Sequence, residues 1–107
     1  MNYEVIVAES FKKDSKKLLK KYTSLADDIE KLIDSLEVDP TLGTPLGQDC
    51  YKIRLAIKSK RKGKSGGARV ITNVKIIGET VYLLSIYDKS EKDDYTDDEL
   101  NNWLSAI

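Results

Sequence analysis

The sequence contains no histidine and only one cysteine, Cys50, among its 107 residues. Zinc sites are built mainly from Cys and His side chains, so we expect no zinc site, and no metal or other cofactor. A single cysteine excludes an internal disulfide framework and is typical of a reducing compartment, which predicts a cytoplasmic protein. Without histidine, any acid–base chemistry falls to Lys, Arg, Tyr, Asp or Glu.

The sequence also lacks a long apolar run. No stretch approaches the roughly 18 to 20 apolar residues needed to cross a bilayer, and the first ten residues are not typical of a signal peptide. Hydrophobic residues make up 40% of the chain and charged residues 34%, which supports one small core. We therefore predict a single domain, residues 1–107, with no membrane association.

Positive charge is distributed unevenly along the chain. The formal net charge is zero, with 18 Lys and Arg against 18 Asp and Glu, yet residues 50–78 contain no acid. This stretch carries nine basic residues: Lys52, Arg54, Lys58, Lys60, Arg61, Lys62, Lys64, Arg69 and Lys75. Such a local concentration favours binding of a polyanion, with nucleic acid as the leading candidate.

The apolar periodicity predicts an α+β fold in the order strand–helix–helix–strand–strand–strand–helix. Alternating patterns predict strands over residues 3–7, 51–58, 68–77 and 81–87. Residues 68–77 and 81–87 are apolar at both parities, so we expect both faces of these strands to be covered. We predict that the last three strands form a small antiparallel meander, that the first pairs at one edge, and that the helical hairpin packs on one face.

Capping residues set the expected ends of the helices. Ser10 is the expected N-cap of the first helix, and Ser24 with Asp27 resembles a capping pattern for the second. The second helix is expected to end at Asp39-Pro40, before a Pro/Gly-rich connector over residues 41–47. Thr96 and Glu99 fit a capping box for a short terminal helix.

The first helix is expected to have one apolar and one lysine-rich side. The apolar side comprises Phe11, Leu18, Leu19 and Tyr22. The other side carries six lysines: Lys12, Lys13, Lys16, Lys17, Lys20 and Lys21. These lysines form either an ordinary solvated face or a second contact with a nucleic-acid backbone.

The strand predicted over residues 51–58 has one apolar and one basic face. Lys52, Arg54 and Lys58 share one parity, so they are expected to line up at intervals of about 6 to 7 Å, close to the phosphate repeat of an extended strand of nucleic acid. Arg69 begins the next predicted strand and should lie beside them. The alternative is an ordinary solvated sheet face.

Two further segments are candidates for the site. Residues 63–67 form a Gly-rich basic loop that either presents backbone N–H groups to phosphate or is a flexible hairpin loop. Tyr95 ends the polar segment after the last strand. It either stacks on a base or transfers a proton, or else it packs against the terminal helix.

Three short motifs resemble the RelE/ParE superfamily of toxin–antitoxin toxins. They are Asp49-Cys50-Tyr51-Lys52-Ile53-Arg54-Leu55, Gly67-Ala68-Arg69-Val70-Ile71 and Ile86-Tyr87-Asp88-Lys89-Ser90-Glu91. The run Gly-Lys-Ser-Gly-Gly-Ala-Arg-Val is especially similar to the HigB-type branch. The resemblance covers most of the chain, and the predicted order of elements is the order that the family implies.

The resemblance implies a metal-independent endoribonuclease that cuts messenger RNA on the ribosome. In that chemistry the ribose 2′-OH attacks the adjacent phosphate and leaves a 2′,3′-cyclic phosphate. Lys52 and Arg54 match the family's basic pair, and Arg69 matches the arginine that would hold the scissile phosphate. Lys89 would protonate the leaving oxygen, and Tyr95 would stack on the base or take the 2′ proton. Lys58, Arg61 and Lys64 are the further candidates for RNA binding.

The family also implies partners and an alternative function. We expect a cognate antitoxin, often a helix-turn-helix protein in this family, that covers the basic face or displaces the terminal helix. The alternatives are a ParE-like toxin, which inhibits DNA gyrase and cuts nothing, and a non-catalytic module that binds nucleic acid. We also expect Arg69→Ala to abolish toxicity and leave the fold intact.

Overall fold

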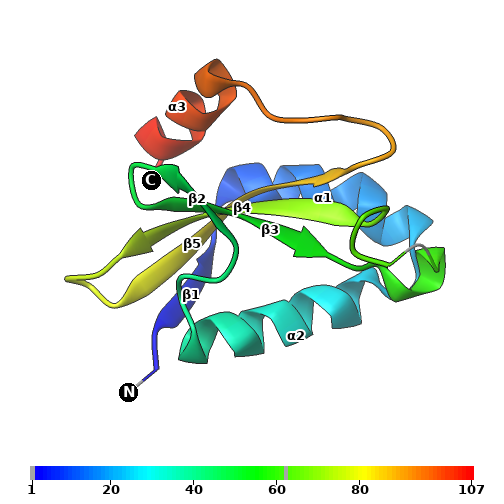
Figure 1. The fold of residues 1–107 in the computed structure, drawn as a ribbon, viewed down its shortest axis with the longest axis horizontal. Helices are drawn as coiled ribbons and strands as arrows, with labels where there is room; N and C mark the ends of the chain where they lie inside the picture. The colour runs from blue at the N-terminus through cyan, green and yellow to red at the C-terminus, as the bar shows by residue number, and fades with distance from the viewer. Residues whose placement is uncertain (1, 62) are drawn as a thin grey trace.

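The computed structural model describes residues 2–61 and 63–107, so Lys62 of the basic stretch lies outside the described residues. A five-stranded sheet is flanked by three α-helices, with α2 and α3 on its two sides (Figure 1). The elements are β1 (Glu4–Val7), α1 (Glu9–Lys21), α2 (Leu25–Val38), β2 (Thr44–Gly47), β3 (Cys50–Leu55), a 3-10 turn (Lys58–Lys60), β4 (Ala68–Lys75), β5 (Thr80–Asp88) and α3 (Asp97–Ser105).

The sheet has the strand order β1-β5-β4-β3-β2. The predicted antiparallel meander is confirmed as β3, β4 and β5, and β1 lies at one edge as expected. However, β1 pairs with β5 in parallel, so the sheet is mixed rather than wholly antiparallel. The chain runs from β1 through α1 and α2 to β2 at the opposite edge of the sheet. Three antiparallel pairings, β2–β3, β3–β4 and β4–β5, then bring β5 beside β1 in the same direction.

One strand of the sheet, β2, was not predicted from the sequence. The connector over residues 41–47 contains β2, which pairs with β3 through Thr44↔Lys52 and Pro45↔Tyr51. The connector contains Pro45 and two glycines. Both residue types are depleted in strands, so residue propensities do not predict a strand there. Proline is nevertheless tolerated at a sheet edge, where its missing N–H breaks no ladder.

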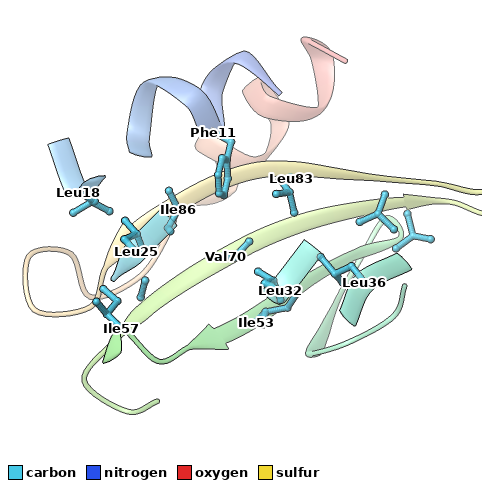
Figure 2. Packing of buried hydrophobic residues seen from close by; sticks show 13 residues of the cluster. Phe11, Leu18, Leu25, Leu32, Leu36, Ile53, Ile57, Val70, Leu83 and Ile86 are labelled. Atoms are coloured by element: carbon cyan, nitrogen blue, oxygen red, sulfur yellow. The ribbon is translucent and has the colours of Figure 1, made fainter. Parts of the chain in front are cut away.

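Two apolar clusters lie on opposite faces of the sheet. The larger one joins both helices of the hairpin to the strands, and Figure 2 shows Phe11 and Leu18 of α1 and Leu32 and Leu36 of α2 packing toward the sheet. The smaller cluster lies under α3 and contains Cys50, Ile71, Leu84, Tyr87 and Leu100. β4 is buried along seven of its eight residues, which confirms that it is covered on both faces.

The start of α1 differs from the prediction. Ala8, not Ser10, is the N-cap, and no side chain caps this end. Ser10 instead lies in the first turn and donates its hydroxyl to the carbonyl oxygen of Leu84 at 2.5 Å, a contact with the backbone of β5. Leu19 was predicted on the apolar side but is 42% exposed, and Ser15 is buried in the helix instead.

The ends of the second and third helices agree more closely with the sequence predictions. Ser24 is the N-cap of α2, but its hydroxyl donates to Asp28 and accepts from the backbone N–H of Ser59, not from the backbone of α2, so the predicted cap with Asp27 does not form. α2 ends at Val38, before Asp39-Pro40, as predicted. Thr96 and Glu99 form both bonds of the expected capping box.

Two strands end earlier than the alternation suggests. β3 stops at Leu55, and Lys58 begins the 3-10 turn, so the prediction that Lys58 lies on the same strand face as Lys52 and Arg54 is wrong. β4 stops at Lys75, and the apolar pair Ile76-Ile77 lies exposed in the turn to β5. Among the described residues, no helix combines the length and the apolar character that a membrane crossing requires.

Candidate nucleic-acid interface

The centre of the candidate site is a pair of arginines on adjacent strands. Arg54 of β3 lies directly opposite Arg69 of β4 in the antiparallel register. Residues opposite each other in such a ladder point to the same face, with Cβ atoms about 5 Å apart. Ile53 and Val70 belong to the larger cluster, so the arginines, at the other parity, face the side that carries α3. Lys52 shares this parity and lies opposite Ile71.

The two arginines differ in their surroundings. Arg54 is exposed, and within residues 2–61 and 63–107 no hydrogen bond or ion pair engages its side chain. Arg69 is only 6% exposed. Its guanidinium donates to the carbonyl oxygens of Lys64 at 2.9 Å and Ser65 at 3.3 Å, both in the Gly-rich loop.

These contacts give Arg69 a structural task, which the expectation that Arg69→Ala leaves the fold intact did not take into account. The guanidinium bridges the start of β4 and the loop before it, because it also donates to the carbonyl of Ala68 at 3.1 Å. A buried guanidinium must find acceptors for its donors, and the loop carbonyls supply them. Arg69 thereby fixes the conformation of the loop that carries Lys64.

A groove of about 650 Å³ runs along the edge of β3 beside α2. Leu32 and Leu42 contribute apolar surface to it, and five cations line it: Lys31, Lys52, Arg54, Lys58 and Lys64. The proximity of Lys31 lowers the pKa of Lys58, because two like charges disfavour each other's charged forms. The groove therefore continues the basic surface from the sheet face around the sheet edge.

Arg61 stands apart from this groove. It is exposed and follows the 3-10 turn with φ of 58°, in the left-handed region. Of the three residues predicted for RNA binding, the structure places Lys58 and Lys64 in the groove with Arg54 and leaves Arg61 outside its lining.

The segment from Lys89 to Thr96 folds back over the α3 side of the sheet (Figure 1). It brings Asp94 to Lys52, with 3.3 Å between Lys52 Nζ and Asp94 Oδ1. The same oxygen accepts from the Tyr87 hydroxyl at 3.2 Å and from the backbone N–H of Tyr95 at 2.9 Å. Burial alone would raise the pKa of Asp94, but these donors outweigh it and lower the pKa below its ordinary value.

Tyr95 packs near the terminal helix, which is one of the two roles that the sequence left open. Its ring packs near Trp103 of α3, with 6.4 Å between ring centroids, and the Lys52 ammonium lies 5.7 Å from its centroid. Burial, followed by the charges of Asp94 and Asp97, raises the pKa of the Tyr95 phenol. The phenol therefore stays neutral near pH 7, which favours stacking or hydrogen-bond donation over proton abstraction.

Lys89 is held at the end of β5. Its backbone N–H donates to the carbonyl of Gly67 at 3.1 Å, and its ammonium donates to the carbonyl of Asp93 at 2.6 Å. Gly67 is required at this position because a Cβ there would lie 2.2 Å from the Leu55 carbonyl oxygen. Across the described residues, no hydrogen bond or ion pair joins Lys89 to Lys52, Arg54, Arg69 or Tyr95.

A buried ion pair lies beneath this region and was not predicted. The Lys60 ammonium and the Asp88 carboxylate are 2.5 Å apart, with side chains 8% and 0% exposed. Tyr22 and Ser90 also donate to Asp88. Burial alone would raise the pKa of Asp88, but these donors hold it well below the ordinary range. No sequence pattern links Lys60 to Asp88, because the two residues are far apart in the sequence and meet only in the folded protein.

In the part of the chain that the structure describes, no three Cys, Asp or Glu side chains gather in a way that could hold a metal ion. Cys50 is buried, and burial raises the pKa of its thiol, which makes it a poor nucleophile.

Comparison with known proteins identifies the architecture. No family model and no curated protein sequence matches this chain. Chains of solved structures do match, among them the following three. An arginine-to-alanine double mutant of the Escherichia coli toxin RelE in the free state aligns with a TM-score of 0.63 and 18% identity, and covers 100% of this chain and 99% of that chain.

The isolated E. coli RelE toxin aligns with a TM-score of 0.62 and 18% identity, and covers 98% of this chain and 99% of that chain. The intact E. coli RelBE toxin–antitoxin complex aligns with a TM-score of 0.61 and 21% identity, and covers 80% of this chain and 95% of that chain. From β1 to α3, this chain has the fold of the RelE toxin.

Proposed function

We propose that this protein is the toxin of a type II toxin–antitoxin module and acts as a ribosome-dependent mRNA endonuclease of the RelE/HigB type. One observation carries the proposal most strongly. Cations from two separate strands, Arg54 and Arg69, meet on one sheet face, and Lys52 and Tyr95 pair beside them. A fold shared with RelE supports this assignment, and we further propose that residues 1–107 act as one toxin domain in the cytoplasm.

The proposed reaction is attack by the ribose 2′-OH on the adjacent phosphate, which yields a 2′,3′-cyclic phosphate and a free 5′-OH. Charge on the nonbridging oxygens increases in the transition state, so fixed cations near them lower the barrier. Arg54, exposed and unpaired among the described residues, is suited to contact these oxygens directly. Lys52 supplies a second positive charge on the same face.

The other residues of the site take supporting roles in this proposal. Arg69 holds the Gly-rich loop through its carbonyls, so it shapes the site as well as adding charge. Tyr95 stacks on a base next to the cleaved bond, since its phenol stays neutral. Lys89 protonates the leaving oxygen once Asp93 releases its ammonium. Lys58, Arg61 and Lys64 guide the RNA backbone.

No residue of the site is an obvious general base. Positioning by the ribosome then contributes most of the rate enhancement. Holding the 2′-OH in line with the scissile bond removes a large part of the activation barrier. We therefore expect little cleavage of free RNA and rapid cleavage of message on ribosomes. A cognate antitoxin is the expected partner, as in the RelBE complex.

A ParE-like inhibitor of DNA gyrase is the second candidate, since it shares the superfamily resemblance. The paired arginines beside Lys52 and Tyr95 favour RNA cleavage over this alternative. Primer extension on messages from cells that express the protein tests the choice. Cuts within translated codons support the endonuclease, whereas intact messages with gyrase-dependent DNA breaks support the second candidate and reject the first.

A further inference from the structure

The sequence places two aspartates, Asp93 and Asp94, in a segment that should meet RNA. In the structure these acids do not point away from the cations. Asp93 pairs with Lys89 at 3.0 Å, and Asp94 pairs with Lys52 at 3.3 Å. Asp94 differs from Asp93 in that two of its partners lie on strands of the sheet, β3 and β5, and the third is the backbone of the next residue, whereas Asp93 meets only a residue four positions away.

Three donors converge on one oxygen of Asp94. They are the Lys52 ammonium on β3, the Tyr87 hydroxyl on β5 and the backbone N–H of Tyr95. An ammonium, a hydroxyl and a backbone N–H are the groups that proteins use to hold a phosphate oxygen. A carboxylate oxygen and a phosphate oxygen are equivalent acceptors for such a set.

We propose that these three donors form a subsite for one phosphate of single-stranded RNA, and that Asp94 fills this subsite in the free protein as an internal substitute for phosphate. The inference rests on the proposed function, because it requires RNA on the α3 side of the sheet. It goes beyond that function by assigning Tyr87 and Asp94, neither of which belongs to the predicted catalytic set.

The arrangement allows the exchange. Lys52 and Tyr87 are fixed on strands, and the Tyr87 side chain lies in the core cluster under α3. Asp94 is 54% exposed in a segment that is neither helix nor strand, so rotation of its side chain toward solvent empties the subsite. Tyr87 is only 7% exposed, and a buried hydroxyl without a partner is costly, so an incoming anion must replace the carboxylate.

Removing the internal anion should strengthen RNA binding. Asp94→Asn keeps an oxygen that can accept from Tyr87 and removes the charge that competes for Lys52. We expect it to bind a 2′-O-methyl RNA oligonucleotide, which cannot be cleaved, about five-fold more tightly at 0.15 M salt. The slope of log affinity against log salt should steepen by about 0.7, because one more phosphate is neutralised without displacing a carboxylate.

The matched control is Asp34→Asn, which removes the same charge from an exposed position on α2. It should leave both affinity and salt slope unchanged within about two-fold, because exposed charges on separate elements are screened at this salt. In the Lys52→Gln background, Asp94→Asn should no longer change the affinity, since the two residues act as one pair. Fluorescence anisotropy and thermal unfolding are measured for every variant, so that loss of folding is recognised.

Two outcomes would overturn the subsite. The first is Asp94→Asn binding the oligonucleotide no more tightly than Asp34→Asn does. The second is an equal gain from Asp94→Asn with and without Lys52. Failure of the proposed function is separable, because it appears as uncut message on ribosomes with the wild-type protein, whatever the binding of the oligonucleotide.

Discussion

At the scale of single residues, the two arginines of the site carry different tasks despite their adjacent positions. Arg54 is exposed, whereas Arg69 is buried and bonded to three carbonyl oxygens. A substitution at each position therefore affects activity and stability in different proportions. The sequence predicted both arginines from their strand pattern, but only the fold shows which one also supports the Gly-rich loop.

Arg54→Ala should lower the rate of message cleavage on ribosomes by about 100-fold, the usual loss for one charge-stabilising donor. Its free energy of unfolding should stay within about 0.5 kcal/mol of wild type, because the side chain is exposed. Arg69→Ala should lower the rate as well, but should also destabilise the fold by about 1.5 to 3 kcal/mol through lost charged hydrogen bonds. Urea unfolding and single-turnover cleavage measure both quantities. Equal stability losses in the two variants would contradict this division of tasks.

Asp88 makes a testable contribution to acid stability. Its pKa is depressed in the folded protein, so its stabilisation is fully present above the unfolded pKa near 3.9. The stabilisation is lost as the pH falls below that value toward the folded pKa. Asp88→Asn should cost about 3 kcal/mol at pH 7, since it leaves the buried Lys60 ammonium unpaired.

Urea unfolding at pH 7 and at pH 3 checks this prediction. The gap between wild type and Asp88→Asn should narrow at pH 3, because there the unfolded wild-type chain binds a proton at Asp88 while the folded protein keeps the carboxylate ionised, whereas the variant has no carboxyl group to titrate. Asp34→Asn serves as the control, since Asp34 is exposed on α2. A gap that stays constant between the two pH values would exclude a role for the ionised carboxylate.

At the scale of elements, the strongly patterned ones were predictable and the irregular ones were not. β4, β5 and α2 carry strong apolar patterns, and the structure has them where the sequence predicted, except that β4 ends two residues early. β2 exists because β3 provides a ladder for Thr44 and Pro45 to pair with, which is a tertiary effect. The early end of β3, and with it the misplacement of Lys58, has the same origin, because alternation continues in the sequence after the chain turns.

The position of the basic site could be predicted from the alternation and order of the strands. The acidic residue that pairs with it, Asp94, could not. Equal parity put Lys52 and Arg54 on one face, and the meander put Arg69 beside them. The contacts of Asp94 with Lys52 and Tyr87 depend on how residues 89–96 fold back, for which the sequence offers no periodic signal. Loop conformation set by long-range contacts is thus the part that sequence patterns did not supply.

Helix α3 depends on its N-cap to stay over the smaller cluster. It is a helix of only nine residues, and short helices are marginal without capping and packing. Thr96→Ala removes one bond of the capping box and should destabilise the protein by about 1 kcal/mol, whereas Thr96→Ser should be close to neutral. Thermal unfolding measures both variants. Hydrogen exchange should show faster opening of α3 in Thr96→Ala, and unchanged exchange there would count against a dependence on the cap.

At the scale of the whole molecule, zero net charge coexists with strong local charge. The positive groove follows β3, while acids collect in α2 and in residues 88–99. α1 carries its own lysines along β5, two strands away from β3. With strands about 4.8 Å apart and α1 packed about 10 Å above the sheet face, the backbone of α1 lies on the order of 14 Å from β3. That distance exceeds the Debye length of about 8 Å at physiological salt.

The α1 lysines should therefore form a solvated face that contributes little to RNA binding. Lys16→Gln with Lys20→Gln should change the affinity for the 2′-O-methyl oligonucleotide by less than about two-fold at 0.15 M salt, because their charge is screened before it reaches the groove. Lys58→Gln with Lys64→Gln, which removes the same charge from the groove itself, should weaken binding about ten-fold or more. A comparable loss from the α1 pair would instead mean that the RNA also contacts α1, so the binding surface would extend across β4 and β5 to the far side of the sheet.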